Sequence, residues 1–188
     1  MFIAFVKHAD GSSVSRLTRP DGVLIEMRGY GRAHRVPHDL AHAVAEREFG
    51  MDCGVYGSVA AGALYASVRV VSGRPRHDAA ERSRRILRAN GRTVGVAELM
   101  SGIVHRAVET GGAVPIREAR QAWGVVSAQP LPWGYEDVAR ATGSLRALVC
   151  EWEALAPGEN LALDWPRRLV SPVPAPAKVN DRSRVRRR

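Results

Sequence analysis

Residues 2–27 read FIAFVKHADGSSVSRLTRPDGVLIEM, and this stretch decides the fold class of the chain. Three short runs of strand-forming residues, 2–7, 13–18 and 23–27, alternate with turn sequences that contain Asp-Gly and Pro-Asp-Gly. Glycine in such a turn accepts the positive φ that a tight reversal needs. The stretch therefore predicts a three-stranded antiparallel β-meander.

The rest of the chain has a mostly helical pattern. Apolar periodicity, with Pro or Asp at the starts and Gly at several ends, predicts helices over residues 37–50, 55–68, 79–89, 94–110, 115–121 and 136–155. Asn90 and Gly91 are expected to end or kink the third of these helices. Residues 161–165 alternate like a strand that adds to the meander. We therefore expect an α+β fold, in which a small antiparallel sheet packs with about five helices.

A change in composition at Pro166 predicts a domain boundary. The 188 residues suit one globular domain, which we expect over residues 1–165. From Pro166 on, Pro, Arg and Val follow one another without a period, which is typical of a disordered tail over residues 166–188. This tail has eight basic residues and one acidic residue, so it carries +7 of the net charge of +9. We expect it to contact polyanions weakly.

The sequence also argues against a membrane protein. The longest apolar stretch, residues 55–68, is rich in Gly, Ala and Ser and is too short to span a bilayer. The first residues lack the basic start of a signal peptide. We therefore expect a cytoplasmic protein with no membrane partner.

Residues 37–46, PHDLAHAVAE, carry the clearest chemical signal. His38 and His42 are four residues apart at the start of a predicted helix, so their rings project from one face and are close enough to hold one metal ion. Asp39 stands where metal-dependent hydrolases of the His-Glu-x-x-His type have their general base. We therefore predict His38 and His42 as ligands of zinc or another divalent metal, and Asp39 as the catalytic residue.

A third ligand has to come from another part of the chain. Glu46 is eight residues from His38, about 12 Å along a helix, so we expect it to lie outside the ligand set. Two roles remain for it: orienting His42, which we favour, or contributing to a second ion. Among the candidates for the third ligand, Glu98 is favoured because an unpaired carboxylate in its largely apolar helix would be unfavourable. The other candidates are Glu81, His77, His105 and His34.

The same residues have a purely structural interpretation. Asp39 in the first turn of a helix stabilises that helix through its interaction with the helix dipole, and this requires no catalytic role. His38 and His42 can pack or form hydrogen bonds, with Glu46 pairing with His42 or with an arginine. A polar active site without a metal is a third alternative.

Two resemblances accompany these residues. Residues 37–46, with GVYGSVAAG at 54–62, Ser-Gly at 72–73 and AERS at 80–83, resemble a group of small uncharacterised proteins from high-GC actinobacteria, a likeness that implies no known activity. Residues 38–42, HDLAH, are similar to the core of His-Glu-x-x-His zinc metallopeptidases. Here Asp39 replaces the glutamate and is one methylene shorter, which counts against peptidase activity and leaves metal binding open.

Two functions of different classes follow. The first is a metal-binding protein or metal-dependent hydrolase that uses His38, His42 and Asp39. The second is a non-catalytic interaction domain with structural histidines, in which an arginine-rich surface or tail meets an acidic partner. The arginines of that surface are Arg74, Arg76, Arg82, Arg84, Arg85, Arg88 and Arg92.

Overall fold

The computed structural model describes residues 1–29 and 34–176. It contains the antiparallel sheet predicted from the sequence, including the N-terminal meander. Its five antiparallel strands lie in the order β4-β3-β2-β1-β5. They are β1 (Phe2–Lys7), β2 (Ser13–Thr18), β3 (Leu24–Arg28), β4 (Val68–Ser72) and β5 (Asn160–Asp164). The late strand β5 pairs with β1, so the α+β fold with an N-terminal meander and a late strand is confirmed.

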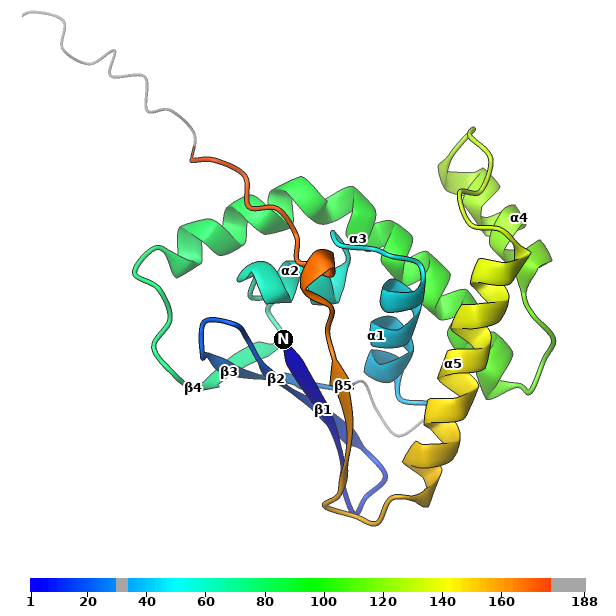
Figure 1. Ribbon diagram of the computed structural model, residues 1–188, viewed down its shortest axis with the longest axis horizontal. Coiled ribbons are helices and arrows are strands. Elements are labelled where there is room, and N and C mark those ends of the chain that lie inside the picture. Colours follow the sequence, from blue (N-terminus) through cyan, green and yellow to red (C-terminus); the bar gives the residue numbers. More distant parts are fainter. Residues whose placement is uncertain (30–33, 177–188) are drawn as a thin grey trace, which may run out of the picture.

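One face of the sheet is apolar and the other is polar. Ile3, Leu17 and Ile25 lie side by side across three strands and are fully buried. The opposite face carries Arg16 and Arg69, which both pair with Glu26. The helices cover the apolar face (Figure 1). This one-sided cover explains why apolar and polar residues alternate along the strands.

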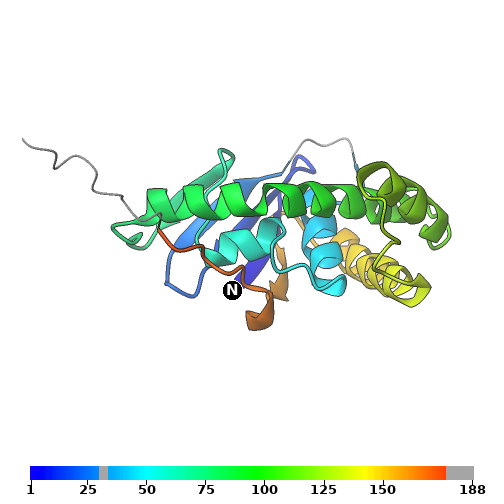
Figure 2. The same cartoon turned by 90° about the horizontal axis from the view of Figure 1, so that it is seen from above.

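The five helices of the described residues form the second layer. They are α1 (His38–Glu48), α2 (Val55–Ala61), α3 (Ala79–Glu109), α4 (Ile116–Val126) and α5 (Tyr135–Ala154). The long helix α3 runs along the molecule, and α1 and α2 lie between it and the sheet (Figures 1 and 2). Helix α5 packs beside α1 and α3. None of these helices combines the length and the hydropathy needed to cross a membrane.

Two predicted helix boundaries are wrong. The helix expected over 55–68 ends at Ala61, because Gly62 has a φ of 114° and reverses the chain, and Val68 then begins the edge strand β4. The break expected at Asn90 and Gly91 is absent, since α3 continues through both residues. The Asn90 side chain is buried and hydrogen-bonded to other segments, so tertiary contacts outweigh its weak helix propensity.

Residues 166–171, which we expected to belong to a disordered tail, are packed against the folded body. Residues 167–169 form a 3₁₀ turn, and Leu169 is buried. The indole Nε1–H of Trp165 donates to the Leu169 carbonyl, and the Ser171 N–H donates to the Gly57 carbonyl on α2. These contacts explain why the boundary is wrong for residues 166–171. The arginine-rich end of the expected tail, residues 177–188, lies outside the described residues.

Candidate metal site

Helix α1 places polar side chains inside the molecule. It begins after Pro37 and ends before Gly50, whose φ of 69° terminates it. All residues from Asp39 to Glu46 are buried, because α1 packs against α3 and α5 and faces the sheet, where Ser15 on β2 donates to Asp39 (Figures 1 and 2). A buried carboxylate or imidazole needs a partner there, and Asp39, His42 and Glu46 each have a hydrogen-bond partner.

His38 and His42 lie together, as their spacing predicts. Their ring centroids are 4.6 Å apart, and both face α3 across the helix pair. Glu98 on α3 joins them, with its Oε2 atom 3.1 Å from Nε2 of His42. One potential ligand atom from each of the three residues lies within 4.8 Å of the other two. The structure thus brings together the three residues predicted as ligands, while their binding of a metal stays a prediction.

Glu98 lies where the predicted third ligand should be, but its surroundings differ from those we expected. We expected its carboxylate to be enclosed by an apolar helix, but its side chain is 54% exposed. Glu98 is next to His42 because α1 and α3 pack closely, and it reaches the imidazole from the solvent side. Its exposure means that solvent reaches this side of the cluster.

Glu46 lies on the other side of the His42 ring. Its Oε1 atom is 3.4 Å from Nδ1 of His42, and its Oε2 accepts the Tyr56 N–H at 2.9 Å. The Glu46 side chain is fully buried. Because Nδ1 faces Glu46, the ring presents Nε2 towards Glu98 and the neighbouring pocket. This contact is equally what the structural interpretation of His42 and Glu46 predicts.

The two carboxylates control the charge of His42. Burial by itself disfavours the imidazolium, but the hydrogen bonds and charges of Glu46 and Glu98 outweigh it and raise the pKa of His42 to about 9. Desolvation raises the pKa of Glu46 in turn. Protonation of Nε2 and ligation of a metal use the same lone pair, so they are alternatives at this atom.

Asp39 is held next to the histidines by the sheet. Its Oδ2 atom accepts a hydrogen bond of 3.0 Å from the Ser15 hydroxyl on β2, and its backbone carbonyl accepts one from the Tyr56 hydroxyl. Ser15 and Tyr56 are not among the site residues predicted from the sequence. The available signal was Ser15 itself, a polar residue that shares the inward face of its strand with Leu17.

A small pocket of about 130 Å³ opens at the site. Its lining includes the three potential ligands together with Asp39 and Tyr65. A water molecule takes up about 30 Å³ in the liquid, so the pocket has room for a few waters or one small polar group. A larger hollow of about 700 Å³ lies on the outer face of the sheet, where Arg16, Glu26 and Arg69 pair with one another.

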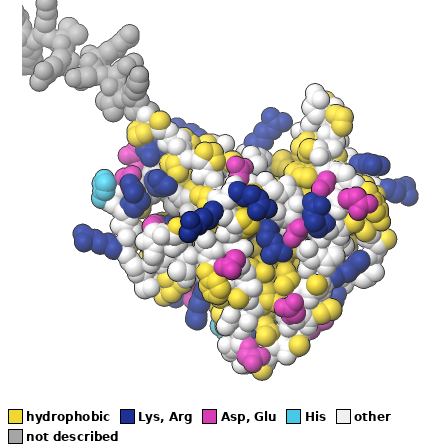
Figure 3. Space-filling model, in the orientation of Figure 1, with side chains coloured by type: hydrophobic (Ala, Val, Ile, Leu, Met, Phe, Trp, Pro, Cys, Tyr) yellow, Lys and Arg dark blue, Asp and Glu magenta, His cyan; other side chains and the backbone are white. Residues whose placement is uncertain are grey.

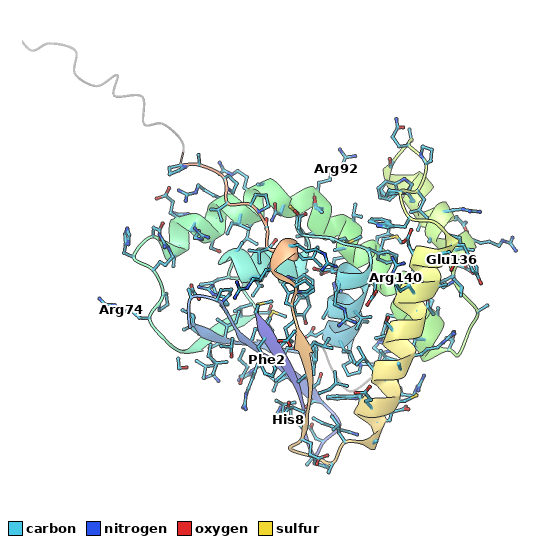
Figure 4. The ribbon with its side chains drawn as sticks, in the orientation of Figure 1. Phe2, His8, Arg74, Arg92, Glu136 and Arg140 are labelled. Atoms are coloured by element: carbon cyan, nitrogen blue, oxygen red, sulfur yellow. The ribbon has the colours of Figure 1, made fainter. Side chains whose placement is uncertain are left out.

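The arginine-rich stretch does not form one continuous surface. Arg82 donates to the Ala61 carbonyl and Arg85 pairs with Glu81, so both have partners within the fold. Arg74 and Arg92 point outwards from well-separated parts of the molecule (Figure 4). On the face seen in Figure 3, basic side chains are interspersed with acidic and apolar ones.

The geometry of the described residues therefore supports a metal site at the histidine cluster better than a polyanion-binding surface on the folded body. The comparisons with known proteins bring no further candidate: the chain matches no protein-family model, no curated protein and no solved structure.

Proposed function

We propose that this protein binds a divalent metal ion, zinc or a metal of similar preference, through His38, His42 and Glu98. The observation that carries the proposal is that these residues, from two different helices, bring three potential ligand atoms within 4.8 Å of one another. Two imidazoles and a carboxylate form a donor set that suits zinc. The contact of Glu46 with Nδ1 of His42 adds the carboxylate that commonly orients a ligating histidine.

We further propose that the site is that of a metal-dependent hydrolase. Three protein ligands leave a coordination position open, and a bound metal would supply an activated water there. The pocket that the ligands share with Asp39 gives such a water access from solvent. Asp39, positioned by Ser15, is the candidate for accepting its proton.

The test is a calorimetric titration of tag-free protein with zinc, together with elemental analysis of the purified protein. The variants are Glu98→Gln and His38→Ala, whose side chains are partly exposed, so the fold should tolerate both. The matched control is His77→Ala, which removes an exposed histidine outside the cluster. We expect the wild type and the control to bind alike and each ligand variant to bind at least tenfold more weakly.

Unchanged zinc affinity in both ligand variants would contradict the metal site. It would favour the rival function, a non-catalytic interaction domain in which His42 is a structural ion-pair partner of Glu46 and Glu98. The cytoplasmic location and the weak polyanion contact of the tail remain predictions under either function.

A further inference from the structure

A second group of potential metal ligands lies beside the first. One potential ligand atom from each of His34, His105 and Glu109 lies within 4.8 Å of the other two. The His34 and His105 rings meet edge to face with centroids 5.2 Å apart. Nδ1 of His34 is 4.0 Å from Oε1 of Glu109. The group joins the segment before α1 to the last turns of α3.

We propose that His34, His105 and Glu109 form a second metal site, so that the protein binds two ions. The tautomer of His105 is compatible with ligation through Nδ1. Its Nε2 lies 2.9 Å from the Val36 carbonyl, which can only accept, so Nε2 has to carry the proton. The lone pair of the neutral ring is then on Nδ1, and a backbone carbonyl that fixes the tautomer in this way is common behind metal-binding histidines.

Glu109 is held in place by the segment that carries His34. Its two oxygens accept the N–H groups of Arg35 and Val36, each at 2.9 Å. Every carboxylate oxygen has two lone pairs, so each retains one that can bind a metal. These hydrogen bonds tie the residues following His34 to the end of α3, and the three ligands are therefore brought together by the fold itself.

The two groups of potential ligands are distinct but lie next to each other. Glu98 and His105 are seven residues apart on α3, about 10 Å along the helix, which is too far for one carboxylate to bridge two ions. The rings of His38 and His105 have centroids 6.1 Å apart, so the histidines form a row from His34 to His42. The His34 side chain in this group is 52% exposed and the Glu98 side chain in the first group is 54% exposed, so solvent reaches one potential ligand of each group.

Stoichiometry tests this inference independently of the proposed function. Tag-free protein is titrated with zinc, and with cobalt(II) as a spectroscopic probe of the ligand set. Two variants address the second site: His34→Ala removes a partly exposed ligand, and His105→Gln keeps a donor for the Val36 carbonyl while removing Nδ1. Glu98→Gln addresses the first site, and His77→Ala is the control.

We expect two equivalents of metal in the wild type and in the control, and one in His34→Ala and His105→Gln. One equivalent in the wild type that is lost in Glu98→Gln and kept in His34→Ala would overturn the second site and leave the proposed function standing. One equivalent that is lost only in the His34 and His105 variants would support the second site and contradict the first. Two equivalents that persist in both second-site variants would overturn this inference.

Discussion

Glu46 is the residue on which the chemistry of His42 depends. A fully buried carboxylate is unfavourable unless it is paired, and Glu46 is paired with His42 and with the Tyr56 N–H. Helix geometry alone predicts this role, because eight residues separate Glu46 from His38 and only four separate it from His42. The sequence does not predict that the contact is completely enclosed, since that follows from the packing of α2 over it.

Replacing Glu46 tests its role as the support of His42. We expect Glu46→Gln to keep the helix content, because the amide oxygen of glutamine can still accept the Tyr56 N–H while its amide nitrogen takes the place of Oε1 beside His42. We expect it to weaken zinc binding about 10- to 100-fold, since the charge behind the ligating imidazole is lost. Glu48→Gln is the matched control on the same helix, where Glu48 pairs with Arg140 away from the site. Equal affinity in the two variants would contradict the prediction.

The raised pKa of His42 predicts a pH dependence of stability in the metal-free protein. A histidine whose folded-state pKa is about 9 instead of 6.5 stabilises the fold fully below pH 6.5 and loses this effect as the pH rises through 9. With a chelator present, we expect the urea midpoint to fall as the pH is raised from neutral to above 9.

Glu98→Gln is the control for this pH dependence. It removes one of the two carboxylates that raise the pKa of His42, so the fall in the urea midpoint should move to lower pH. A midpoint in the wild type that stays flat or rises over this range would show that His42 is not protonated between the carboxylates.

At the scale of elements, the junction of α1 and α2 holds Glu46 in place. Gly54 precedes α2, and a Cβ atom there would overlap the Glu46 carboxylate. We expect Gly54→Ala to lower the free energy of unfolding by about 1–3 kcal/mol and to weaken metal binding, because the carboxylate has to move. Chemical denaturation and zinc titration measure the two effects.

The control for Gly54 is Gly91→Ala in the middle of α3. A Cβ at Gly91 meets nothing within 4 Å, so alanine should stabilise the helix by about 0.5–1 kcal/mol. Equal effects of the two substitutions would mean that glycine is not needed for space at Gly54.

Some helices and strands can be predicted from local sequence signals and others cannot. The strands β1 to β3 and the helices α1 and α5 follow from turn residues and periodicity, because these signals lie within each element. The edge strand β4 was missed, since its residues follow a small-residue run that continues a helical pattern. Val68 and Val70 are in a strand because they pair with β3 at the edge of the sheet. This pairing depends on the tertiary structure, so local sequence signals do not predict it.

At the scale of the whole molecule, Asn90 ties three distant segments together. Its Nδ2 donates to the hydroxyls of Ser58 on α2 and Ser171 in the C-terminal segment, at 2.9 and 2.8 Å. We expect Asn90→Ala to lower the free energy of unfolding by about 1–3 kcal/mol, because two buried hydroxyls lose their donor. We also expect faster tryptic cleavage at Arg167 and Arg168, which the C-terminal segment carries on its exposed side.

Arg92→Ala is the control for Asn90 on the same helix. Arg92 points away from the fold (Figure 4), so its removal should change stability by less than about 0.5 kcal/mol and leave cleavage unchanged. Unaltered stability and cleavage in Asn90→Ala would mean that the C-terminal segment is held by its apolar contacts alone.

The sequence by itself determined the α+β class, the meander and the pairing of His38 with His42 on one helix face. These features depend on residues a few positions apart, where backbone geometry alone sets the outcome. Only the tertiary structure decided that Glu98 meets His42 across 56 residues of chain, and that His34, His105 and Glu109 assemble beside them. It also decided that residues 166–171 fold. The physical reason is that each of these contacts joins separate elements, whose mutual placement follows from the burial of α1 between α3 and the sheet (Figures 1 and 2).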